Sequence, residues 1–180
     1  MTIEMAETRP HTQPLIVISS RTGNTMILGH AICDALPGAV LVRPKDLPAD
    51  LTPYNPVLLG FWRDLDDAPE EMRAVAPRFE GKTIGCFATM GGDAESQEAR
   101  DWMARTAKRL VEAGRGNTLA QTFLCRGRFD PEEFRRITAM MAGRPGFEGE
   151  EKRSASDTHP DRLDLEKGAE LFRSVFGMNF

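Results

Sequence analysis

The order of three segments near the N-terminus most constrains how this chain can fold: an apolar run, a loop of small polar residues and an amphipathic stretch. Residues 15–18, LIVI, have the composition of a buried parallel strand. Residues 26–36 repeat apolar side chains at helical spacing, and Pro37-Gly38 ends that pattern. The face expected to be buried consists of Ile27, Leu28, Ala31, Ile32, Ala35 and Leu36. A strand that leads through a short loop into a helix places the loop at the carboxyl edge of a sheet.

The loop between these segments has the residue types of a phosphate-binding turn. Gly23 tolerates a positive φ, which lets backbone N–H groups converge, and the start of a helix adds unpaired N–H groups and a partial positive charge. Neither G-x-G-x-x-G nor G-x-x-x-x-G-K-[ST] occurs here, so the common dinucleotide and nucleoside-triphosphate loops are excluded. We therefore predict a phosphate site, with a hydroxyl-rich helix cap as the alternative. Hydroxyl groups are offered by Ser20, Thr22 and Thr25.

Apolar runs and helical patterns alternate along the rest of the chain. We expect strands at residues 39–42, 57–61, 83–88 and 119–125, and helices at 68–79, 96–113, 130–141 and 163–176. The proline-interrupted stretch 44–56 is expected to be a loop with one helical turn, and residues 128–160 an irregular excursion. Residues 1–13 are expected to be a flexible lead-in to a single domain, 14–180. The alternation predicts an α/β fold with a doubly wound, five-stranded parallel sheet in the order 2-1-3-4-5.

Three loops with polar or aromatic residues follow the first, third and fourth predicted strands. They are residues 20–25, 62–67 and 89–93. In the predicted strand order, the carboxyl ends of these strands meet where the direction of winding changes, which is where ligands bind in such sheets. The sequence therefore predicts one site built from all three loops.

The motifs in these loops resemble those of the flavodoxin family from about residue 15 to the C-terminus. S-x-T-G-N-T after the first strand is similar to the loop that holds the phosphate of flavin mononucleotide (FMN), and Gly60-Phe61-Trp62 is similar to the strand end that places a ring against the isoalloxazine. Residues 88–93, ATMGGD, are similar to the loop at the pyrimidine edge. The resemblance implies FMN as cofactor, held by Ser20, Arg21, Thr22, Gly23, Asn24, Thr25, Phe61, Trp62, Arg63, Asp64, Thr89, Met90, Gly91 and Gly92.

The chain departs from the family pattern in three places. Met90 stands where many flavodoxins have a tyrosine that stacks on the flavin, which leaves Trp62 as the expected large aromatic of the site. Residues 63–67 contain no glycine, although a glycine is common at the tip of this loop in the family. Residues 128–160 match no part of the family pattern. Trp102, in the middle of a predicted helix, is expected to be a core residue.

Charge and composition exclude several classes of protein. The net charge of −4 argues against a general nucleic-acid binder, and the sequence contains no apolar run long enough to span a membrane. The three cysteines form no C-x-x-C motif, so we expect buried free thiols in a reducing, cytoplasmic environment. His11, His30 and His159 are expected to bind no metal. The acidic turn at Asp64, Asp66 and Asp67 is either simply solvated or lowers the reduction potential of a bound flavin.

These features together predict a flavin-dependent redox protein. The sequence contains no nucleophile or acid–base constellation, so the flavin would carry the chemistry. Electrons would pass to a partner protein, as in a carrier, or to a small-molecule acceptor, as in a small oxidoreductase. A basic tract after the fifth strand is either a solvated face or a docking surface for an acidic redox partner. The alternative function is a flavin-free binding or scaffold module with the same fold.

Overall fold

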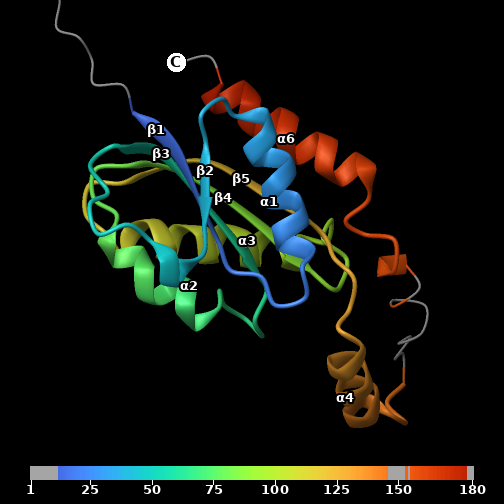
Figure 1. Ribbon diagram of the computed structural model, residues 1–180. Helices are drawn as coiled ribbons and strands as arrows, with labels where there is room; N and C mark the ends of the chain where they lie inside the picture. The colour runs from blue at the N-terminus through green and yellow to red at the C-terminus, as the bar shows by residue number, and fades with distance from the viewer. Residues whose placement is uncertain (1–11, 146–152, 154, 178–180) are drawn as a thin grey trace, which may run out of the picture.

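A computed structural model describes residues 12–145, 153 and 155–177 of the chain (Figure 1). Its centre is a five-stranded parallel sheet in the order β2-β1-β3-β4-β5, which confirms the predicted fold. The strands are β1 (Gln13–Ile18), β2 (Val40–Val42), β3 (Tyr54–Trp62), β4 (Thr83–Met90) and β5 (Thr118–Arg126). The middle strands β1, β3 and β4 are apolar and almost fully buried, as expected for strands covered on both faces.

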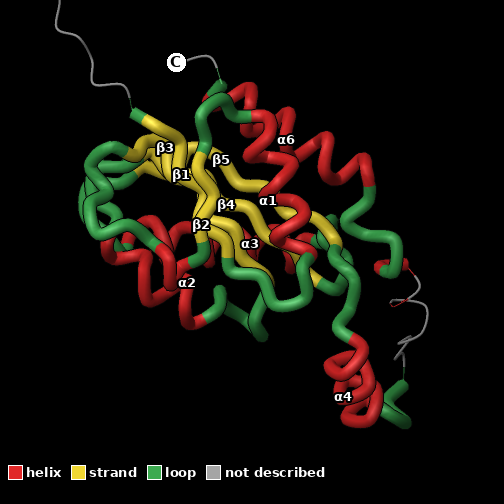
Figure 2. The backbone as a smooth tube through the Cα atoms, viewed as in Figure 1, coloured by secondary structure: helices red, strands yellow, loops and turns green. Residues whose placement is uncertain are grey.

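Helices cover both faces of the sheet (Figure 2). Helices α1 (Asn24–Ala35) and α6 (Arg162–Phe176) lie together on one face, and α2 (Glu70–Val75) and α3 (Gln97–Glu112) lie on the other. Each face has its own core. Phe61 meets Trp102 edge to face under α3, and Phe87 meets Phe172 edge to face under α6. Trp102 is fully buried, as predicted.

One residue of the predicted buried face of α1 is exposed in the structure. Leu28, Ile32 and Leu36 are buried in the core beneath α6, but Ile27 is 43% exposed. Gly29 takes its place, because the helix approaches the sheet so closely that a Cβ at Gly29 would lie 2.0 Å from the Ile18 side chain. The helical pattern therefore identifies α1 correctly, but it assigns Ile27 to the buried face in place of Gly29.

Two other predicted elements have different limits in the structure. The helix predicted to reach residue 79 ends at Val75 and continues as the 3₁₀ turn η2 (Ala76–Arg78), because Pro77 cannot continue an α-helical ladder. Strand β3 begins at Tyr54 rather than at residue 57. It accommodates Pro56 beside a register shift, since Gln13 pairs with Tyr54 while Leu15 pairs with Val57. The expected helical turn is the 3₁₀ turn η1 (Pro44–Asp46).

Helix α4 (Pro131–Met141) stands apart from the two helical layers and projects from the end of β5 (Figure 1). Asp130 caps its start by accepting hydrogen bonds from the backbone N–H groups of Glu132 and Glu133, at 2.7 and 3.1 Å. Phe134 is its buried residue, packed against Phe129 with the ring centroids 5.7 Å apart. The expected irregular excursion lies partly outside the described residues, as does the lead-in up to residue 11. None of the described helices is long and apolar enough to cross a membrane.

Candidate functional site

The turn between β1 and α1 gathers backbone N–H groups at the carboxyl edge of the sheet. Gly23, with φ of 93°, is the N-cap residue of α1 and has the left-handed conformation that the sequence predicts. Ser20 Oγ accepts hydrogen bonds from the N–H groups of Gly23 and Met26, at 3.2 and 3.3 Å. The N–H groups of Thr22, Asn24 and Thr25 have no hydrogen-bond acceptor among the described residues. The turn thus offers an anion the free donors of a helix start.

Two side chains of the turn tie it to neighbouring loops. Thr25 is 1% exposed, and its hydroxyl lies 2.9 Å from that of Thr89 at the end of β4. Asn24 Nδ2 donates to the backbone oxygen of Arg128, at 2.8 Å, and to Thr22 Oγ1, at 3.2 Å. Thr25 and Asn24 therefore position the turn through their side chains, while the exposed Thr22 keeps its hydroxyl at the surface.

A cavity of about 290 Å³ opens beside the turn. It brings together loops from the ends of β1, β3 and β4, as predicted from the strand order. The expected site residues that line it are Arg21, Thr22, Asn24, Thr25, Trp62, Arg63, Thr89, Met90, Gly91 and Gly92. Its volume is near the lower end of the range for ligand clefts, roughly 300–1,000 Å³.

Four expected site residues do not line this cavity. Gly23 contributes only its backbone to the turn. Ser20 and Asp64 line a second, more open hollow on the other side of Arg21 and Trp62, beside Glu70 and Glu71. Phe61 is fully buried against Trp102, because successive residues of a strand point to opposite faces of the sheet. The expectation that Phe61 reaches the site is therefore not met.

One side of the cavity comes from the segment after β5, which was not expected at the site: Arg128, Phe129, Asp130, Glu133 and Ile137. Leu65, which belongs to the expected loop 62–67, also lines the cavity. The Phe129 ring rests on Gly91, where an added Cβ would lie 2.6 Å from two ring atoms. Gly127 N–H donates to the Met90 carbonyl at 2.8 Å, which holds this segment against the end of β4. An aromatic side chain just beyond the end of β5, the neighbour of β4, was the available signal.

Arg21 connects the turn to both sides of the cavity. Its guanidinium forms an ion pair with Glu133 of α4 and lies over the Trp62 ring, 4.5 Å from the centroid. A cation in this position contacts the face of the indole favourably. Arg21 therefore occupies space beside the ring of Trp62, the residue expected to contact the flavin.

The acidic loop after β3 is held by a second arginine. Arg63 forms two hydrogen bonds with Glu98 of α3, at 2.5 and 2.9 Å, and donates through Nε to the Leu65 carbonyl at 3.0 Å. The hydrogen bonds from Arg63 lower the pKa of the Glu98 carboxyl. Asp64 and Asp67 exchange two backbone hydrogen bonds of 3.0 Å, which close the loop into a tight turn.

Leu65 takes the backbone conformation that glycine would favour at the tip of this turn. Its φ is 54°, its side chain is 82% exposed, and it lines the mouth of the cavity. Leucine pays a steric cost in this region, and such strain is concentrated at functional sites. The chain thus keeps the glycine-like tip geometry without the glycine.

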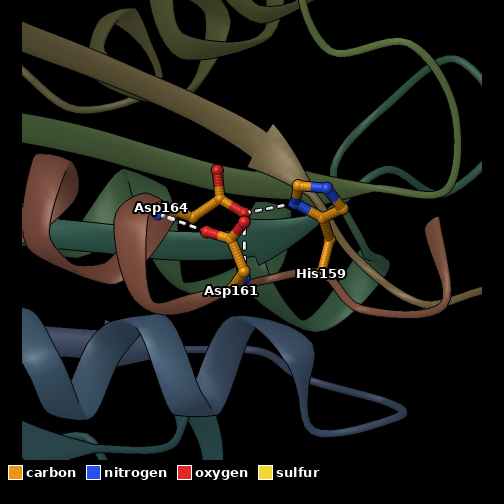
Figure 3. Close-up of side chains that lie close together, drawn as sticks. All are labelled: His159, Asp161 and Asp164. Carbon is orange, nitrogen blue, oxygen red and sulfur yellow. Dashed lines mark hydrogen bonds and ion pairs between the residues drawn. The ribbon is translucent and has the colours of Figure 1, made fainter. Parts of the chain in front are cut away.

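The remaining reactive side chains lie outside the cavity. Burial raises the pKa of the Cys86 thiol to about 12 and raises that of Cys125 further, so neither is a nucleophile in the folded chain. His159, Asp161 and Asp164 offer ligand atoms within 4.8 Å of one another (Figure 3). Their polar atoms already pair with each other and cap the start of α6, which is a structural role. His30 is exposed on α1.

Comparison with known proteins identifies the class to which this fold and site belong. The family model described as a flavodoxin domain matches residues 15–173, so the chain belongs to the flavodoxin family. The flavodoxin-like domain-containing protein BilS of Clostridioides difficile (strain CD3) is 22% identical over 159 residues, which cover 84% of this chain and 89% of BilS.

Solved structures show the same fold at low sequence identity. Oxidised flavodoxin 1 from Bacillus cereus matches with a TM-score of 0.58 and 15% identity, over 94% of this chain and 99% of that one. An azoreductase from Bacillus anthracis str. Sterne matches with a TM-score of 0.55 and 13% identity, over 91% of this chain and 99% of that one. At these identities the likeness concerns the fold.

Proposed function

We propose that this protein binds FMN in the cavity at the carboxyl edge of the sheet and works as a redox protein. The observation that carries the proposal is the turn at Gly23, whose free N–H groups lie at the cavity beside Trp62. A terminal phosphate suits these donors, because several N–H groups and the positive end of α1 act on one anion. Family membership supports the same cofactor.

The residues around the cavity fit the rest of this cofactor. Trp62 and Phe129 are flat rings, and Met90 offers a polarizable thioether that contacts aromatic rings favourably. Backbone groups of the Met90–Gly92 loop stand at the edge of the cavity. When bound, FMN supplies the electron-transfer chemistry, and the chain contributes binding, orientation and charge.

We further propose that electrons pass from this site to a partner protein or to a small-molecule acceptor in the cytoplasm, with no role for nucleic acid or membrane. The exposed Leu65 and the basic Arg128 line the same cavity, and together they provide an apolar contact and positive charge, which suits an acidic protein surface. The second hollow, on the side of Trp62 away from the cavity, is lined by the acidic Asp64 and Glu70 and is therefore negatively charged. Such charge lowers the reduction potential of a flavin held nearby.

Titration of the apoprotein with FMN and with FAD tests the proposal. We expect FMN to bind well and FAD poorly, because the turn suits a terminal phosphate at one helix start. Binding should quench the emission of Trp62, and the Trp102→Phe variant should keep that quenching because Trp102 is buried on the α3 face. No binding of either flavin would refute the proposal and favour a flavin-free scaffold, and equal affinities would refute the assignment of the phosphate site.

A further inference from the structure

We infer that Glu133 competes with the phosphate of the ligand for Arg21, and that it thereby sets how strongly the site discriminates between phosphorylated and unphosphorylated flavin. This inference rests on the proposed FMN site. It assigns a specificity-determining role to a residue of α4 that lies more than a hundred positions along the chain from the phosphate-binding turn.

The first step is the position of the Arg21 guanidinium. It extends from the turn that carries the anion donors, pairs with the Glu133 carboxylate and covers the Trp62 ring. A ligand phosphate at this turn places a second, stronger negative charge beside the same guanidinium. Arg21 therefore has two alternative anionic partners, one supplied by the protein and one by the ligand.

The second step is that the pair is exposed enough to exchange. The side chains of Arg21 and Glu133 are 45% and 25% exposed, so water competes for both. Arg136 Nη2 lies 3.7 Å from the other oxygen of Glu133, so this carboxylate keeps a cationic neighbour when Arg21 turns away. Exchange leaves no buried charge unpaired.

The third step is the attachment of α4. Hydrogen bonds fix the segment before the helix to the edge of the sheet. The Gly127 N–H donates to the Met90 carbonyl, and Asn24 Nδ2 donates to the Arg128 carbonyl. The described part of the helix itself makes no extensive contact with another helix or strand, and it meets the turn through Glu133. Loss of the Arg21–Glu133 pair therefore leaves the base of α4 anchored while releasing its contact with the turn.

The consequence is that Glu133 weakens the binding of FMN but not that of riboflavin. FMN replaces the Arg21–Glu133 pair with a charge-assisted contact between its phosphate and Arg21, whereas riboflavin has no anion that could do so. Removing the Glu133 charge should help FMN, because the competitor for Arg21 disappears. It should change riboflavin binding little, because no part of riboflavin takes the place of the carboxylate.

The test measures dissociation constants of FMN and riboflavin for the apoprotein and its variants by fluorescence titration. Glu133→Gln should bind FMN about fivefold more tightly, the size expected for an exposed ion pair, and should change riboflavin affinity by less than about twofold. Glu132→Gln is the matched control, since Glu132 is exposed, lies one position earlier in α4 and carries no ion pair in the described part of the chain. It should shift both affinities by less than about twofold.

The same substitution in an Arg21→Gln variant distinguishes competition for Arg21 from direct repulsion between Glu133 and the phosphate. In Arg21→Gln protein, adding Glu133→Gln should change FMN affinity by less than about twofold. A persistent fivefold gain there, an unchanged or weaker FMN affinity in the single variant, or an equal gain for riboflavin would overturn the inference. Failure of the unmodified protein to bind either flavin would instead overturn the proposed function beneath it.

Discussion

At the scale of the residue, one side of the cavity depends on a side chain that is absent. Gly91 allows the Phe129 ring to lie directly on the backbone of the loop after β4. The neighbouring Gly92 has a different environment, since a Cβ there would meet only the flexible Met90 methyl group, at 3.2 Å. The structure therefore requires glycine at position 91, whereas position 92 has room for a Cβ.

This difference predicts that Gly91→Ala lowers the free energy of unfolding by about 1 kcal/mol, because the Phe129 ring must move away from the new methyl group. Gly92→Ala is the control and should have little effect. Denaturant unfolding of both variants measures the difference. In a Phe129→Ala background the cost of Gly91→Ala should disappear, and its persistence would show that the strain lies elsewhere.

The residues at the site also show where sequence reasoning loses information. Gly23, Trp62 and Met90 could be placed because each directly follows a recognisable strand or begins a recognisable helix. Phe129 offers a weaker signal, an aromatic side chain just beyond β5, but the positions of Phe129 and Glu133 at the cavity depend on how the chain turns after β5, which no local pattern encodes. Leu65 shows a related limit: the loop composition reveals the missing glycine, but the backbone of this loop also depends on its contacts with α3, such as the hydrogen bonds of Arg63 with Glu98 and of Arg109 with Asp67.

At the scale of the element, strands and long helices are the predictable parts of this fold. Apolar runs identify all five strands, and the 3.6-residue pattern identifies α3 and α6 with limits within a residue or two. The errors fall where a single residue overrides a pattern, as Pro77 does in α2 and Gly29 does on the buried face of α1. Those positions depend on backbone chemistry and close packing, to which periodicity is insensitive.

Helix α6 provides a prediction at this scale because its start is closed by reciprocal hydrogen bonds. Asp161 accepts from the Asp164 N–H at 2.9 Å, Asp164 accepts from the Asp161 N–H at 3.0 Å, and His159 Nδ1 lies 2.5 Å from Asp164 (Figure 3). The backbone hydrogen bond from Asp164 lowers the pKa of the Asp161 carboxyl, and the nearby His159 acts in the same direction. A carboxyl with a lowered pKa stabilises the folded state above its ordinary pKa.

Asp161→Asn should therefore lower the melting temperature at pH 6, because the neutral amide loses the charged interaction with the helix start. The difference from the unmodified protein should shrink as the pH falls from the ordinary aspartate pKa through the lowered one, where both side chains are uncharged. Thermal unfolding between pH 6 and pH 2.5 measures this. Asp34→Asn, an exposed carboxylate with no ion pair or hydrogen bond among the described residues, is the control; a difference independent of pH would contradict the assignment.

At the scale of the whole molecule, the two cores and the cavity are coupled through the sheet. Cys86 lies in the core under α3 and Cys125 in the core under α6, and burial is the first cause of the raised pKa of both thiols. A thiol reacts with alkylating agents as the thiolate. In the folded protein these two residues are therefore protected by burial and by protonation together, so their labelling requires opening of the molecule.

The proposed cofactor should slow that labelling, which gives a prediction for the chain as a whole. A ligand that binds only the folded state lowers the population of open molecules by the factor 1 + [L]/Kd, so FMN at a hundred times its Kd should slow alkylation of Cys86 and Cys125 by about a hundredfold. Mass spectrometry of each labelled cysteine at pH 8 measures the rates, under conditions in which opening and closing are faster than reaction. Cys33 is the internal control, because it is only partly buried and reacts through local motion that FMN affects less. If Cys125 is protected but Cys86 is not, the two faces of the sheet open independently, and the ligand stabilises only the face that carries α1 and α6.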